Sequence, residues 1–164
     1  MPQRLLRNST IKVAELLQKA INEVASMRKG ALSSEFICMA LLEQKDSIAL
    51  KVFDELRLET PKLRKKLIDK MLEISSVLPD VSNLNVPVSL KVTQDVQILF
   101  EQADIERKNL GDSYISTAAV FLGFFATQLR TAEVLVKEGV ERKACFDAVR
   151  NLRGSVVISE KDGE

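Results

Sequence analysis

The second half of the chain repeats the first half. Most of the match follows a single shift in sequence position, the one that places Leu99 on Leu16, and we call this shift the repeat offset. The residue pairs that match at this offset are Leu16 and Leu99, Ala20 and Ala103, Ser33 and Ser116, Met39 and Leu122, and Ala49 and Ala132. One residue is then lost, and an offset shorter by one continues the match by placing Cys145 on Leu63. Two copies are too few, and the period is too long, for helical arrays built from repeats of about 33 to 47 residues. The sequence therefore predicts a tandem duplication of one unit.

Both copies carry apolar residues at helical spacing. In the first copy Val13, Leu16 and Leu17 recur at steps of three and four, which places them on one helical face. Capping residues and the Thr60-Pro61 pair predict four helix starts in this copy. The expected starts are Ser9 or Thr10, with Gly30 after the end of that helix, then Ser33 or Ser34, Asp46 or Ser47, and Thr60. In the second copy the expected helices cover about 93–109, a segment from Ser116, about 131–137 and about 142–152.

This pattern predicts an all-α fold, in which a tandem repeat of two four-helix units packs as a pseudo-twofold helical domain with a groove between the units. The double repeat is expected over 1–154, with repeat one at about 9–75 and repeat two at about 92–152. Between them SSVLPDVSNLNVPVS breaks the helical period, which predicts a linker at about 76–91. After Gly154 the residues 155–164 have no helical period and are expected to form a flexible linker leaving the domain.

Charge and hydropathy exclude two classes of partner. The 24 basic and 23 acidic residues leave a net charge of +1, which gives no electrostatic case for nucleic acid or an anionic membrane surface. The basic run Arg64 to Lys66 alternates with apolar residues and is interpreted as a solvated helix face. The longest apolar stretch, residues 118–126, is too short to span a bilayer and is expected to be a buried helix.

The residue types present exclude most enzyme chemistry. The chain has no histidine, so neither a Ser-His-Asp triad nor an HExxH zinc site can form. Cys38 and Cys145 lack metal-ligand spacing and are interpreted as buried thiols in a reducing cytoplasm. Two Ser-x-x-Lys patterns lack the partner motifs of the β-lactamase type, and no GxxxxGK[ST] loop occurs. We therefore expect no catalytic residue, metal or cofactor in these 164 residues.

The double repeat, with LGDSYIST in the second copy and VRNLRG at its end, closely resembles the N-terminal domain of Clp/Hsp100 ATPases. The segment VKEGVERKACFDAVRNLRGS and the acidic tail are most similar to the ClpB branch of disaggregases. The sequence departs from the family where Glu-His usually precedes the leucine run of each repeat. Those positions read Glu35-Phe36 and Ala118-Ala119, so the chemistry of the groove is expected to differ.

The resemblance implies a domain that receives unfolded or aggregated protein or adaptor proteins, ahead of ATPase rings that use ATP and Mg²⁺. The residues 155–164 would tether it to those modules. The implied location is the cytoplasm, and the implied full-length assembly is a homohexamer, whereas this domain alone is expected to be a monomer. Two alternatives stay open: an adaptor-docking domain of a ClpA- or ClpC-like unfoldase that feeds a peptidase, and a stand-alone Clp-repeat adaptor.

Four residues are candidate substrate contacts. By the resemblance, Thr10 and Asp112 match family positions that line a site near the repeat junction. The alternative is that Thr10 caps a helix and Asp112 serves a turn. Phe100 and Tyr114 could supply apolar surface at the junction, or could belong to the core. Asp112→Ala is expected to leave folding nearly intact and to weaken the capture of a denatured protein.

Overall fold

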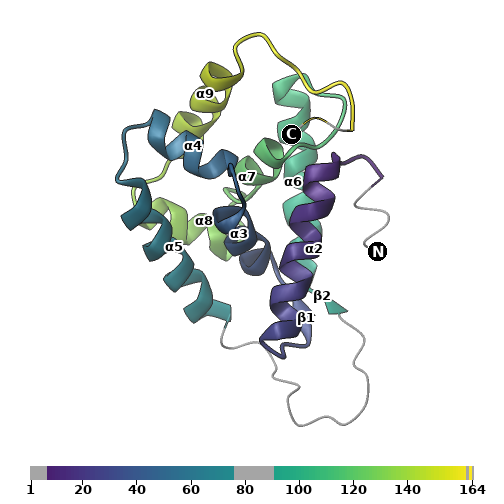
Figure 1. The fold of residues 1–164 in the computed structure, drawn as a ribbon, viewed down its shortest axis with the longest axis vertical. Coiled ribbons are helices and arrows are strands. Elements are labelled where there is room, and N and C mark those ends of the chain that lie inside the picture. Colours follow the sequence, from purple (N-terminus) through teal and green to yellow (C-terminus); the bar gives the residue numbers. More distant parts are fainter. Residues whose placement is uncertain (1–6, 76–90, 162, 164) are drawn as a thin grey trace.

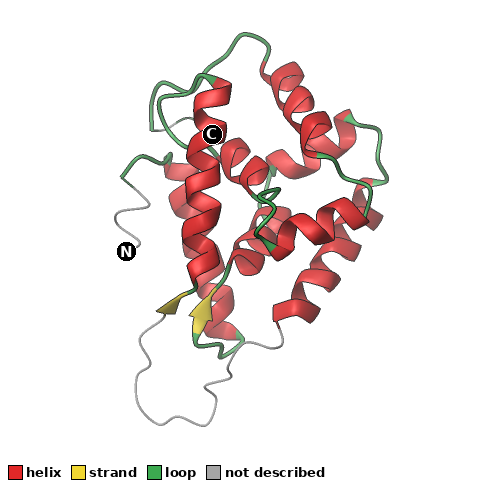
Figure 2. Cartoon of the chain, turned by 180° about the vertical axis from the view of Figure 1, so that it is seen from behind, coloured by secondary structure: helices red, strands yellow, loops and turns green. Residues whose placement is uncertain are grey.

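The computed structural model describes residues 7–75, 91–161 and 163 of the chain. In this part of the chain eight helices form two sets of four (Figures 1 and 2). The first set is α2 (Ile11–Ser26), α3 (Ser34–Glu43), α4 (Ile48–Glu55) and α5 (Thr60–Ser75). The second set is α6 (Gln94–Leu110), α7 (Thr117–Gly123), α8 (Arg130–Lys137) and α9 (Arg142–Arg153). The predicted all-α fold with two four-helix units is confirmed.

The predicted helices and the observed ones agree closely in order and position. The linker expected at about 76–91 lies outside the described residues except for Lys91, which belongs to the two-residue strand β2 (Lys91–Val92). Sequence reasoning did not predict this strand or its partner β1 (Ala31–Leu32). The boundaries of the repeats and of the tether stay predictions.

The two strands join the beginnings of helices from different repeats. Strand β1 precedes α3 of the first repeat, and β2 precedes α6 of the second. The strands pair in parallel, and the backbone N–H of Thr93 extends the ladder by donating to the carbonyl of Leu32 at 2.9 Å. Each strand therefore finds its partner in the other repeat.

A second pairing of the same kind lies at the other junction of the repeats. Ser9 forms a parallel bridge with Ile115, and the N–H of Thr10 donates to the carbonyl of Ile115 at 2.9 Å. The repeat offset places Thr10 on Thr93 and Ile115 on Leu32, so the two hydrogen bonds are equivalent. These two pairings connect the main chains of the repeats in the predicted pseudo-twofold arrangement.

Helices α3 and α7 form the centre of the molecule. All residues of α7 and those from Ser34 to Leu42 in α3 are buried, as expected for helices that are apolar on every side. The ring of Phe53 on α4 meets the ring of Phe121 on α7 edge to face, with centroids 6.0 Å apart. The core is thus shared between the repeats.

Helix ends also follow the duplication. Gly111 and Gly139 adopt positive φ after helices of the second repeat, and Arg28 and Arg57 adopt positive φ at the equivalent positions of the first. The left-handed residue after α2 is therefore Arg28, and not the Gly30 that the sequence suggested. Arginine tolerates this conformation less well than glycine, so the first repeat keeps the backbone geometry without the residue that favours it.

Candidate functional site

The turn after α6 is built around a buried ion pair. Gly111 ends the helix in the left-handed conformation, and the side chain of Asp112 is then 0% exposed. Both carboxylate oxygens accept hydrogen bonds from Nη1 of Arg153, at 3.0 and 2.8 Å, and the Arg153 side chain is only 5% exposed. Nη2 of Arg153 donates to the Ser116 hydroxyl at 3.0 Å, so the guanidinium joins the end of α9 to the start of α7.

The chain turns back onto the domain after α9. Gly154 has φ 63° and ψ −123°, a conformation that only glycine adopts readily. The N–H of Val156 donates to the carbonyl of Arg153 at 3.2 Å and closes a turn of type II′. Figure 1 shows this segment, in yellow, running from α9 towards the ends of α6 and α2. We call residues 155–161 the strap.

The strap lies on the junction of the repeats as an irregular segment that is neither helix nor strand. The N–H of Ile158 donates to Oδ1 of Asp112 at 2.9 Å, and the N–H of Ser113 donates to the carbonyl of Ile158 at 2.7 Å. Further along, the N–H of Ile11 donates to the carbonyl of Lys161 at 2.7 Å. Ile158 is 7% exposed. The junction therefore holds a stretch of polypeptide through its main chain and one buried side chain.

Three of the four candidate substrate residues border the strap. Asp112 bonds to it directly, and Nζ of Lys161 lies 5.8 Å from the centre of the half-buried Tyr114 ring. Thr10 is buried beside Ile11 and caps α2, with its hydroxyl accepting from the N–H of Val13 at 3.3 Å. The roles of these residues in substrate binding stay predictions.

The fourth candidate, Phe100, lies on the buried face of α6 within the apolar core. Two residues that sequence reasoning missed, Arg153 and Ile158, hold the strap site together. The available signal was the apolar run Val156, Val157, Ile158, which is unusual in a segment expected to be a flexible linker.

The other repeat junction brings together two carboxyl groups, the buried Glu35 and the half-buried Asp95. Burial raises the pKa of Glu35, and the nearby charge of Asp95 raises it further. Burial alone would also raise the pKa of Asp95, but hydrogen bonds from the hydroxyl groups of Ser34 and Thr93 and from the Ser34 amide outweigh it and lower that pKa. The Ser34 amide lies 3.1 Å from Oδ2 of Asp95. The hydrogen bonds therefore favour the charged form of Asp95, whereas burial and the neighbouring carboxylate disfavour the charged form of Glu35.

Glu35→Gln is expected to raise the free energy of unfolding at pH 7 by about 1 kcal/mol. Because the pKa of Glu35 is raised by folding, its contribution to stability is complete below its ordinary pKa of 4.5 and is lost as the pH rises through the folded-state value. Glutamine keeps the neutral form at every pH, so its advantage should grow from pH 4 to pH 8 in denaturant titrations. Glu43→Gln, which removes an exposed carboxyl group from the same helix, is the matched control. An advantage that is constant with pH would contradict this account.

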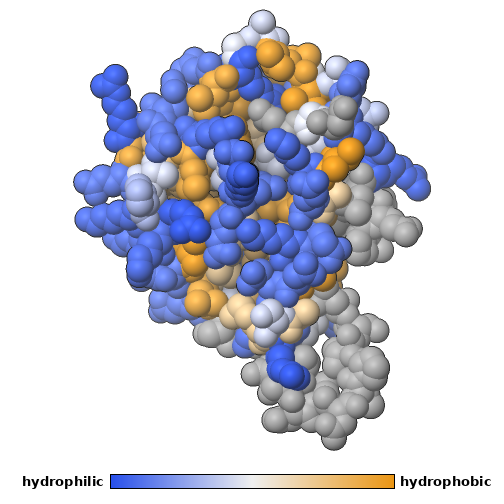
Figure 3. Space-filling view, in the orientation of Figure 1, coloured by the Kyte–Doolittle hydropathy of each residue, from blue (hydrophilic) through white to orange (hydrophobic). Residues whose placement is uncertain are grey.

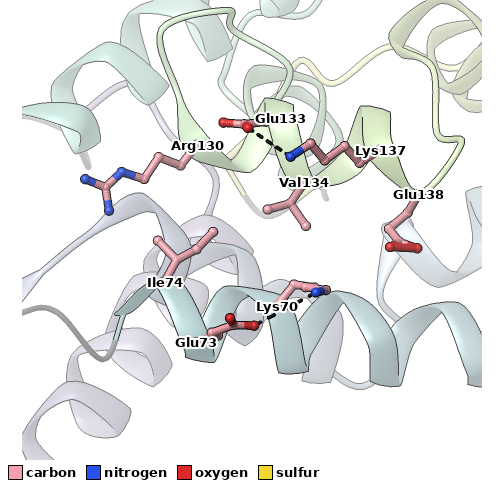
Figure 4. Close-up of a pocket in the computed structure, with 8 residues that line it drawn as sticks. All are labelled: Lys70, Glu73, Ile74, Arg130, Glu133, Val134, Lys137 and Glu138. Atoms are coloured by element: carbon pink, nitrogen blue, oxygen red, sulfur yellow. Dashed lines mark ion pairs between the residues drawn. The ribbon is translucent and has the colours of Figure 1, made fainter.

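A groove of about 490 Å³ lies between α5 and α8 (Figure 4). Ile74 and Val134 supply its apolar surface. The charged residues around them are Lys70, Glu73, Arg130, Glu133, Lys137 and Glu138. Ion pairs within each helix join Lys70 to Glu73 and Lys137 to Glu133. The visible face of the molecule shows the same mixture, with small apolar areas separated by charged side chains (Figure 3). Neither charge nor shape selects a particular ligand for this groove.

No cluster of three or more metal-binding side chains occurs among the described residues. Within the same residues, none of the helices combines the length and apolar character that crossing a membrane requires. Both cysteines are buried, and burial raises the pKa of Cys145 to about 12 and that of Cys38 higher still. This agrees with their interpretation as unreactive buried thiols.

The fold is that of a helical double-repeat domain, and its own C-terminal segment packs on the junction of the repeats. The chain belongs to the Clp repeat (R) N-terminal domain family, whose profile matches residues 8–138. Among curated relatives, it is 27% identical over 157 residues to the chaperone protein ClpB of Pseudomonas putida and 25% identical over 157 residues to that of Corynebacterium glutamicum. These alignments cover 93% and 96% of this chain but 18% of each relative.

Solved structures share the fold at low sequence identity. The Hsp104 N-terminal domain of Candida albicans matches with a TM-score of 0.75 and 14% identity, over 94% of this chain and 97% of that one. The N-terminal domain of the caseinolytic protease associated chaperone ClpD of Arabidopsis thaliana matches with a TM-score of 0.57 and 15% identity, over 90% and 96%. The resemblance to Clp/Hsp100 N-terminal domains is thereby confirmed.

Proposed function

We propose that this chain is the substrate-binding N-terminal domain of a ClpB-like AAA+ chaperone, and that it captures unfolded or aggregated polypeptide at the repeat junction beside Asp112. The observation that carries the proposal is the strap, an irregular segment held at this junction through main-chain hydrogen bonds. Membership of the Clp repeat family and similarity to ClpB proteins support it.

Such a domain needs neither sequence-specific contacts nor high affinity to capture unfolded protein. An unfolded protein presents unpaired backbone groups and apolar side chains, so a site that bonds to backbone and buries one side chain can bind many sequences. Weak binding suffices for a tethered domain, because the second encounter, with the ATPase pore, becomes effectively intramolecular. In the proposed whole protein, ATP and Mg²⁺ belong to downstream modules, which assemble the hexamer in the cytoplasm.

The test uses one protein in two states. Reduced, carboxymethylated α-lactalbumin is unfolded, and the native form of the same protein is the control. We expect the domain to bind the unfolded form at least about tenfold more tightly, which corresponds to about 1.4 kcal/mol. Fluorescence anisotropy of labelled lactalbumin measures both affinities. Equal binding of the two forms, or none to the unfolded form, would refute the proposal.

A second candidate is an adaptor-docking domain of a ClpA- or ClpC-like unfoldase, and the fold shared with the ClpD domain favours keeping it. The coding frame beyond Glu164 separates the candidates. GxxxxGK[ST] loops followed by a peptidase-docking loop would favour the unfoldase, and the same loops without it would favour the ClpB-like chaperone. A frame that stops at Glu164 would leave a stand-alone adaptor.

A further inference from the structure

We propose that the strap occupies the peptide site of its own domain, and that the surface beneath it accepts an extended segment with an aliphatic side chain in the place of Ile158. External polypeptide would then bind by displacing the strap. This inference rests on the proposed function and adds to it a side-chain preference and an internal competitor.

The main-chain contacts show how one residue of a guest chain is held. Asp112 accepts from the N–H of Ile158, and the N–H of the next residue, Ser113, donates to the carbonyl of Ile158. Adjacent positions of the turn thus bind both backbone groups of a single residue. These contacts are independent of side-chain identity, so any extended chain could make them.

The exposed fractions of the strap side chains indicate which kind of residue fits the site. Ile158 is 7% exposed, whereas Val156 and Val157 are 62% and 53% exposed. Ile158 is therefore the buried aliphatic side chain of the strap, whereas its two preceding neighbours are exposed to solvent. A polar or charged side chain in this place would lose its hydration without a compensating hydrogen bond.

The site does not depend on the strap for its shape. Arg153 belongs to α9 and holds Asp112 in place through contacts that remain when residues 155–161 leave. The strap itself is fixed at its start by the turn at Gly154, whose combination of φ 63° and ψ −123° only glycine adopts readily. An added Cβ at Gly154 would meet no atom within 4 Å, so a substitution there would act on the backbone alone.

The test compares variants that release the strap with one that should not. Ile158→Ser removes the buried side chain, and Gly154→Val disfavours the turn while leaving the strap sequence intact. Val157→Ser changes an exposed neighbour and is the matched control. The probes are a fluorescein-labelled peptide with the strap sequence SVVISEK, the same peptide with serine in place of isoleucine, and unfolded carboxymethylated α-lactalbumin. Circular dichroism checks that each variant stays helical.

We expect both releasing variants to bind the SVVISEK peptide at least tenfold more tightly than the parent domain or Val157→Ser, and the serine peptide to bind none of them. Unfolded lactalbumin should follow the same order. If lactalbumin binds the parent and all variants equally and the peptide shows no gain, the strap proposal is refuted while the proposed function stands. If the peptide gains affinity but lactalbumin binds no variant, self-occupation of the site is supported and the proposed function fails.

Discussion

Asp112→Ala is expected to lower the free energy of unfolding by about 3 to 5 kcal/mol, because it takes the carboxylate of a buried ion pair away from the Arg153 guanidinium. Both side chains are almost completely buried, so water cannot replace the lost carboxylate easily. The N–H of Ile158 also loses its acceptor. Denaturant titration followed by circular dichroism measures the change. This expectation replaces the one from the sequence, in which Asp112 contacts substrate and its loss leaves folding nearly intact.

Two further variants distinguish the effect of breaking the buried ion pair on stability from the effect of removing a negative charge. Adding Arg153→Met to Asp112→Ala removes the buried cation as well, so the double variant should be more stable than Asp112→Ala alone. Asp104→Ala removes a partly exposed carboxylate that pairs with Arg107, and it should cost about 1 kcal/mol or less. If Asp112→Ala unfolds at the parent denaturant concentration yet binds unfolded protein poorly, Asp112 is a substrate contact and not an anchor.

The helices could be predicted because their signals are local or repeated. Apolar positions at steps of three and four and the Thr60-Pro61 start each depend on a short stretch of chain. The structure starts α5 at Thr60 and α9 at Arg142, as these signals indicated. The duplication added further support, since a helix assigned in one copy implied its counterpart in the other.

The strap and the ion pair could not be predicted in this way because they are contacts between distant residues. Asp112 and Arg153 lie 41 positions apart, and Asp112 and Ile158 lie 46 positions apart. Neither separation leaves a periodic pattern. A carboxylate after a helix-ending glycine is a common turn residue, and only the fold shows that an arginine from α9 reaches it.

The two repeat junctions began as equivalents and have diverged in sequence. At the repeat offset, Asp112 corresponds to Lys29 and Asp95 corresponds to Lys12. One junction therefore carries the acceptor that binds the strap, and the other carries the carboxyl pair of Glu35 and Asp95. The duplication supplies a shared geometry, and single substitutions distinguish the junction that holds the strap from the one that holds the carboxyl pair.

Phe121→Ala is expected to lower the free energy of unfolding by about 4 kcal/mol, since it removes a large side chain from the centre of the core. The Phe121 ring meets Phe53 and Phe125 edge to face, at centroid distances of 6.0 and 5.9 Å. Phe53 belongs to the first repeat and Phe121 to the second, so the cavity would open between the repeats. Denaturant titrations read by circular dichroism and by Tyr114 fluorescence measure the loss.

Two control variants test whether the stability lost in Phe121→Ala depends on the position and volume of the ring in the core. Phe146→Ala removes a half-buried ring that lies beneath Arg142 at the surface, and it should cost much less than Phe121→Ala. Phe121→Leu keeps most of the buried volume and should cost less than about 1.5 kcal/mol. Because the core is continuous across the repeats, both probes should give one coincident transition in the parent and in every variant. Two separate transitions in Phe121→Ala, with the Tyr114 signal lost apart from the helical signal, would show instead that each repeat keeps a core of its own.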